Sequence, residues 1–156
     1  MADEKRACPS LSELGYDKVF VSLDGSEQQG KVLERAIVTA ANNGSELYIG
    51  HVIDSSALET TGSFPAELVK EQEQSFRASI AEEVERARQI PSIRGVEVLV
   101  KFGRIRETLK DEMIDEIEPD LIICGARGLS SIKYALLGSI STFLVRSARC
   151  DTLVIK

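Results

Sequence analysis

The stretch 119–125, Pro-Asp-Leu-Ile-Ile-Cys-Gly, decides the fold class. It places four consecutive apolar residues, Leu121 to Cys124, between a proline and an acidic residue on one side and a glycine on the other. A short apolar run without polar alternation is typical of a strand that is buried on both faces, as strands of parallel sheets are. The stretch therefore predicts an interior strand of a parallel sheet.

Four similar runs lie elsewhere in the chain. They occupy residues 19–21, 47–53, 96–100 and 153–155. Between successive runs, apolar residues recur at helical spacing. Those positions are Val32, Leu33, Ala36, Ile37 and Ala40; Val69, Phe76, Ile80, Val84 and Ala87; Ile105, Leu109, Met113 and Ile117; and Ile140, Phe143, Leu144 and Ala148. This alternation predicts an α/β fold: a single open five-stranded parallel sheet with helices on both faces, Rossmann-like, with the strand order 3-2-1-4-5.

Local signals predict where the helices begin and end. Ser26 and Gln29 fit a capping box before the first helix. The second segment predicts one long charged helix that ends before Pro91, and Pro119 stops the third. Residues 54–65 lack periodicity and predict a surface loop.

Length and composition limit the classes of protein to consider. The 156 residues predict one domain over residues 15–156, after a loose N-terminal tail over residues 1–14. A formal net charge of −6 argues against non-specific binding to nucleic acid or to anionic membranes. No apolar run of about 18 residues predicts a membrane span, and the first residues lack the apolar core of a secretory signal. Three widely spaced cysteines form no metal framework, which favours a cytoplasmic location.

Two loops should face the crevice at which the strand order reverses, beyond the carboxyl ends of the strands. One begins at Asp24-Gly25-Ser26, and the other reads Gly125-Ala126-Arg127-Gly128, nine residues, then Gly138-Ser139. Glycines let a ligand approach the backbone closely. A helix that begins near the second loop offers unpaired N–H groups and a positive dipole end.

The second loop has the composition of a polyphosphate cradle. We expect Ser139 to be the N-cap of the last helix. Arg127 adds a charge that can pair with phosphate, and the hydroxyl groups of Ser139 and Ser141 add donors. The glycines alone also suit an ordinary turn after a strand, so the spacing and the position after the fourth strand carry the prediction.

Residues 125–139 resemble the G-2x-G-9x-G-S/T motif of ATP-binding universal stress proteins. The resemblance extends over about residues 17–156 and includes 21–26, 51–54 and 119–125. It implies ATP with Mg²⁺ as the ligand, a nucleotide-responsive stress or regulatory binding module, and a homodimer formed through the last strand, residues 152–156. The implied nucleotide-binding residues are Ser22, Asp24, Val52, Gly125, Arg127, Gly128, Gly138, Ser139, Ile140 and Ser141.

Within that set, the resemblance implies distinct roles. Asp24 and the backbone of Val52 would hold the adenine end, and Gly125 would lie against the ribose. The phosphates would be lined by Arg127, Gly128, Gly138, Ser139 and, through its N–H, Ile140, with Ser141 assisting. Two departures from the family pattern concern the pocket wall, where Ser22 replaces a frequent proline, and the last strand, which opens with Asp151-Thr152.

Several rival readings use other residues. Gly25 to Lys31 matches G-x-x-x-x-G-K, but Val32 follows where a Mg²⁺-binding hydroxyl should stand. His51, the only histidine, is expected to be a packing residue, and Cys124 a buried, unreactive thiol.

Two alternatives to the binding module remain: a slow ATPase or nucleotidyl-transfer enzyme, and a scaffold dimer that binds AMP or no nucleotide. Asp24 is the only acidic candidate for catalysis in the two loops, and its place at the adenine end argues against efficient hydrolysis.

Overall fold

The computed structural model describes residues 14–56, 66–127 and 137–156. Five parallel strands form one sheet in the order β3-β2-β1-β4-β5, which confirms the predicted fold class and order. The strands are β1 (Lys18–Ser22), β2 (Glu46–Asp54), β3 (Gly95–Gly103), β4 (Leu121–Gly125) and β5 (Asp151–Ile155). The central strand β1 pairs with β2 on one side and β4 on the other, so their carboxyl ends meet at one edge of the sheet.

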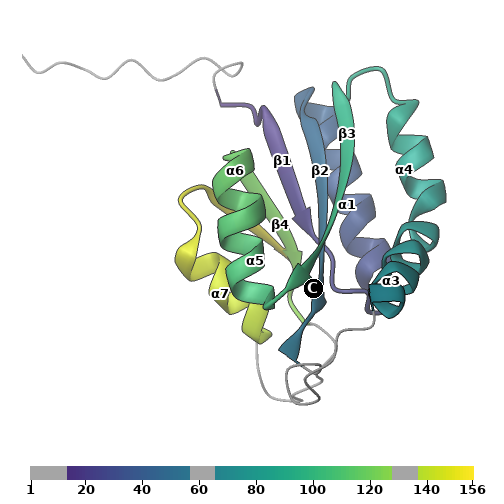
Figure 1. The fold of residues 1–156 in the computed structure, drawn as a ribbon. Helices are drawn as coiled ribbons and strands as arrows, with labels where there is room; N and C mark the ends of the chain where they lie inside the picture. Colours follow the sequence, from purple (N-terminus) through teal and green to yellow (C-terminus); the bar gives the residue numbers. More distant parts are fainter. Residues whose placement is uncertain (1–13, 57–65, 128–136) are drawn as a thin grey trace, which may run out of the picture.

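Helices cover both faces of the sheet (Figure 1). One face carries α1 (Gln29–Asn43), α3 (Ala66–Ser79) and α4 (Ala81–Arg88); the other carries α5 (Ile105–Leu109), the π-helical turn η1 (Lys110–Ile114), α6 (Asp115–Ile117) and α7 (Ser139–Ser147). Because successive strand residues point to opposite faces, β1 supplies both layers. Val19 and Val21 pack toward α1, and Phe20 packs toward η1 and α7.

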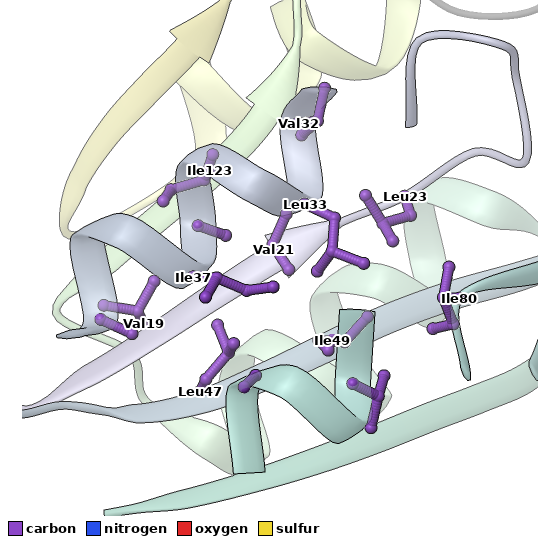
Figure 2. Close-up of a cluster of buried hydrophobic side chains, with 14 of the residues drawn as sticks. Val19, Val21, Leu23, Val32, Leu33, Ile37, Leu47, Ile49, Ile80 and Ile123 are labelled. Carbon is purple, nitrogen blue, oxygen red and sulfur yellow. The ribbon is translucent and has the colours of Figure 1, made fainter. Parts of the chain in front are cut away.

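The larger core lies between the sheet and the α1 layer (Figure 2). Val21 of β1, Ile49 of β2 and Ile123 of β4 are aligned in register and have no exposed surface. Leu33 of α1 packs in the same cluster, as the helical spacing of its apolar residues predicts. This cluster holds the start of α1 firmly against the carboxyl ends of the central strands.

The predicted second helix is wrong in one respect, because it is broken at Ile80 into α3 and α4. Ile80 has φ −118° and ψ 7°, and its side chain is buried. The hydroxyl group of Ser79 donates to the carbonyl oxygen of Phe76 at 2.7 Å, which is the acceptor that the N–H of Ile80 would use in a continuous helix. The break places Phe76 and Val84 in one core although they lie on differently directed helices.

The predicted capping box is also wrong. The residue before α1 is Gln28, in a helical conformation, and no side chain caps this end. Gln29 N–H donates to the carbonyl oxygen of Ser26 at 3.1 Å, so the turn is closed by backbone groups. The side chains of Ser26 and Gln29 are thereby left for other contacts.

The third predicted helix spans the expected residues but contains the five-residue π turn η1. It ends at Ile117, followed by Glu118 with φ 53°, in front of Pro119. Residues 1–13 of the predicted tail and residues 57–65 of the predicted loop lie outside the described residues, and Asp54, the first residue of the predicted loop, ends β2. In the part of the chain that is described, no helix has both the length and the apolar character that a membrane crossing requires.

Candidate functional site

A cavity of about 650 Å³ opens at the carboxyl ends of β1, β2 and β4. Its size is within the range of small-molecule sites. It lies where the strand order reverses between β1 and β4, the position at which open α/β sheets bind ligands. The lining comes from the β1–α1 turn, the end of β2, α3, the end of β4 and the start of α7.

The start of α7 supplies hydrogen-bond donors to this cavity. Thr142 N–H donates to the carbonyl oxygen of Gly138 at 3.0 Å, which is the first hydrogen bond of the helix. The N–H groups of Ser139, Ile140 and Ser141 precede that bond and have no partner within the helix. These three residues line the cavity, so its α7 side is suited to an anion.

The N-cap of α7 is Gly138, whereas the sequence predicted Ser139. Gly138 has an extended ψ of 171° and accepts the first helical bond, while Ser139 is already the first helical residue. The hydroxyl group of Ser139 is therefore not occupied as a cap, and Ser139 is exposed at the rim of the cavity. The absence of a side chain at the cap keeps the approach to the N–H groups open.

The two ends of the segment between β4 and α7 are tied together. Gly138 N–H donates to the carbonyl oxygen of Ala126 at 2.6 Å. The buried hydroxyl group of Ser141 lies 3.2 Å from the same oxygen and 3.0 Å from that of Gly138. Because that hydroxyl proton is used inside the protein, Ser141 helps to hold these two ends together, and its backbone N–H is its remaining donor for a ligand.

The β1–α1 turn forms the opposite side of the cavity. Asp24 Oδ1 accepts the N–H of Ser26 at 2.9 Å, and Gly25 between them has φ 76°. This side-chain-to-backbone turn, which needs a glycine or similar residue at positive φ, fixes the direction of the carboxylate. Its second oxygen remains available to a ligand hydroxyl or amine.

His51, which the sequence predicted as a packing residue, supports that turn from β2. Its Nδ1 lies 2.8 Å from the carbonyl oxygen of Leu23, so Nδ1 carries the proton and donates. The imidazole stacks on the ring of Phe76, with centroids 4.1 Å apart and planes 9° from parallel. The stack joins β2 to α3 at the wall of the cavity, and both residues line it.

Burial lowers the pKa of His51 from its ordinary value of 6.5, against smaller opposing effects of the Leu23 hydrogen bond and the Asp24 charge. As the pH falls, the unfolded chain therefore binds this proton before the folded chain does. The stability that the neutral ring contributes is complete above pH 6.5 and is lost as the pH falls through the lowered pKa of the folded state.

We expect the free energy of unfolding to decrease more steeply between pH 7.5 and 5.5 in the wild type than in a His51→Gln variant. Glutamine can still donate to Leu23, but it does not titrate, and His51 is the only histidine in the chain. Urea denaturation at several pH values measures both slopes. Parallel pH profiles would contradict the role assigned to the ring.

The structure brings nine of the ten predicted site residues to this one cavity: Ser22, Asp24, Val52, Gly125, Arg127, Gly138, Ser139, Ile140 and Ser141. The tenth, Gly128, lies outside the described residues. Sequence reasoning did not assign the side contributed by Gln29, Phe76 and Ser79 to the site. The helical pattern marked Phe76 only as a core residue, and no motif signals that α3 reaches the crevice.

Two rival sites find no support in the geometry. Lys31 does not line the cavity, and its Nζ donates to the backbone oxygen of Lys156, so the lysine of the G-x-x-x-x-G-K match is not directed at a phosphate site there. Cys124 is buried as expected, and burial raises its pKa to about 11, so the thiol stays protonated at neutral pH.

The architecture and the cavity define a class of protein: an open, parallel α/β sheet with a crevice at the switch point, into which the start of a helix projects. The sequence profile of the Universal stress protein family matches residues 15–156. The chain belongs to the universal stress protein family.

Individual relatives agree with this assignment. A protein of Staphylococcus haemolyticus (strain JCSC1435), named as a universal stress protein, is 27% identical over 92% of this chain and 86% of its own length. The structure of universal stress protein UspA from Lactobacillus plantarum is similar with a TM-score of 0.78 and 22% identity, covering 91% of this chain and 99% of that one. A universal stress protein solved in complex with cAMP has a TM-score of 0.68 and 26% identity, covering 91% and 98%.

Proposed function

We propose that this chain binds an adenine nucleotide, ATP by preference, and acts as a nucleotide-responsive binding module. The observation that carries the proposal is the arrangement of the start of α7: three N–H groups ahead of the first helical bond open into a cavity at the switch point. The structural relative solved with cAMP, at 26% identity, supports an adenine ligand for this cavity. The intact G-2x-G-9x-G-S motif supports a polyphosphate.

The lining suits the two ends of a nucleotide. Arg127 is exposed and lines the same cavity as the α7 N–H groups. Its guanidinium group could pair there with the negatively charged phosphates of the ligand. On the other side, Asp24 and the buried strand residue Val52 offer a carboxylate and backbone groups to the nucleoside. Mg²⁺ would be held mainly by phosphate oxygens, because the described lining offers only the carboxylates of Asp24 and Asp54.

A dimer through β5 is part of the proposal. β5 is an edge strand of the sheet, and Leu153 within it is 39% exposed. The free backbone groups of an edge strand favour pairing with a second copy. Sedimentation velocity tests it, and a mass of one chain at micromolar concentration would contradict it.

Saturating ATP is expected to raise the melting temperature. A ligand present at 100 times its dissociation constant adds about 2.7 kcal/mol to the free energy of unfolding, which for a chain of this size is roughly 5–10 °C. Differential scanning fluorimetry with ATP measures the shift, with inorganic tripolyphosphate as the control for phosphate binding alone. No shift with ATP, together with no adenine nucleotide released on denaturing the purified protein, would overturn the proposed function.

A further inference from the structure

Two polar oxygens in the wall of the cavity have no hydrogen-bond partner among the described residues. They are Ser26 Oγ and Gln29 Oε1, and both are shielded from solvent. Both residues line the cavity on the side of the β1–α1 turn, next to Asp24. Buried polar groups are nearly always satisfied, so an unsatisfied one calls for a missing partner.

The orientation of the Gln29 amide follows from its neighbours. The single hydroxyl proton of Ser79 is donated to the carbonyl oxygen of Phe76 at 2.7 Å. Ser79 Oγ can therefore only accept from Gln29, which it does from Nε2 at 3.1 Å. The amide cannot be reversed without losing this bond, so the atom without a partner is an acceptor, Oε1. The relay from α3 to α1 thus holds a carbonyl oxygen in place.

Ser26 is held beside it by its own backbone. Its N–H donates to Asp24 Oδ1, and its carbonyl oxygen accepts the N–H of Gln29. These bonds fix the Cα of Ser26 and leave its hydroxyl group able to donate or accept. The β1–α1 turn and the start of α1 thus contribute one hydroxyl group and one amide oxygen to the wall, and neither is the hydrogen-bond partner of the other.

The same side of the cavity carries no charged side chain from α1 or α3. The residues that these helices and the N-cap residue of α1 contribute are Gln28, Gln29, Val32, Gln72, Ser75, Phe76 and Ser79. A wall of amide, hydroxyl and aromatic groups suits an uncharged, planar group that hydrogen-bonds at its edge. It is poorly suited to a phosphate, which the α7 side would accept.

We propose that Gln29 Oε1 accepts a hydrogen bond from an N–H donor of the ligand, with Ser26 Oγ as the adjacent partner. This inference rests on the proposed function, and the donor is then the exocyclic amine of adenine. A base that carries a carbonyl oxygen at that position would set acceptor against acceptor and leave Gln29 unsatisfied. Sites that offer a hydrogen bond to one group discriminate strongly against analogues that lack it.

The state of Gln29 before binding strengthens the effect. Oε1 has no exposed surface and no partner among the described residues, so a ligand donor that bonds to it satisfies a group that is otherwise left unpaired.

The test compares ATP with ITP, which carries a carbonyl oxygen in place of the amine, by isothermal titration calorimetry. In Gln29→Met, a variant of similar length, we expect ATP affinity to fall about 5- to 10-fold, the value of one hydrogen bond. The affinity for ITP should not fall, because ITP makes no bond to Gln29 and loses an unfavourable contact, so the ATP/ITP affinity ratio falls by at least the same factor. The matched control Gln28→Met, on the adjacent residue of the same wall, should leave the ratio unchanged.

The outcomes separate this inference from the proposed function. If the wild type binds ATP but Gln29→Met, folded by circular dichroism, keeps the wild-type ATP/ITP ratio, the inference is overturned and the proposed function stands. If the Gln29→Met variant loses affinity for ATP and for ITP by the same factor, Gln29 has only a structural role and the inference is again overturned. If the wild type binds neither nucleotide, both proposals fall.

Discussion

Replacing Gly125 with valine is expected to weaken ATP binding by about 100-fold or more, equivalent to about 2.7 kcal/mol, while the chain stays folded. Gly125 is the last residue of β4 and lines the cavity. A Cβ atom at this position would lie 3.3 Å from Val32 Cγ2 and 3.5 Å from the carbonyl oxygen of Arg127. The two further methyl groups of valine have α1 on one side, so they must occupy space in the cavity.

Gly125→Ala is the matched control for this prediction. Its single methyl group requires a shift of only a few tenths of an ångström at Val32, so we expect a much smaller loss of affinity. Isothermal titration calorimetry measures the affinities, and circular dichroism and the melting temperature verify the fold. A folded Gly125→Val protein that binds ATP as the wild type does would place the nucleotide elsewhere.

Replacing Phe20 with alanine is expected to lower the free energy of unfolding by about 3–5 kcal/mol, the usual cost of removing a fully buried phenylalanine ring. Phe20 has no exposed surface and lies in the middle of the central strand β1. Its ring lies over Gly50 of β2: a Cβ on Gly50 would come within 2.4 Å of Phe20 Cζ and 3.1 Å of Met113 Sδ. The ring fills space that the missing side chain of Gly50 leaves, so its loss opens a cavity between β1, β2 and η1.

Urea denaturation measures this loss, and Phe143→Ala is the control. Phe143 is only partly buried on α7, so its truncation should cost less than half as much. A Phe20→Ala variant that unfolds within about 1 kcal/mol of the wild type would show that the layers of this core collapse around the gap.

The sheet could be predicted from the sequence because parallel strands need apolar residues on both faces. The runs around Val21, Ile49 and Ile123 carry that requirement without help from distant residues. Most of the proposed phosphate side could be predicted for a similar reason. The glycines and Ser139 lie within one segment, and the sequence already places them after a strand and before a helix.

Other features depend on contacts between distant segments. The spacing of apolar residues is the same on either side of Ile80, yet the helix breaks there and the side chain of Ile80 joins the core of the α1 layer. The choice of Gly138 over Ser139 as the N-cap depends on the bond between Gly138 N–H and Ala126. Neither interaction leaves a local signal.

The sequence by itself determined the strands, the helices that alternate with them and, through the doubly wound fold class that they define, the edge of the sheet at which a ligand would bind, because hydrophobic period and glycine position are local properties of the chain. Only the tertiary structure decided what forms the other wall of that cavity. Phe76 and Ser79 meet His51 and Gln29 there although they are separated by 25 to 50 positions along the chain. The physical reason is that the hydrogen bond between Gln29 and Ser79 and the ring stack of His51 on Phe76 form only when α3 packs against α1 and β2. The sequence pattern of α3 predicts which face of the helix is apolar, but not where the helix packs.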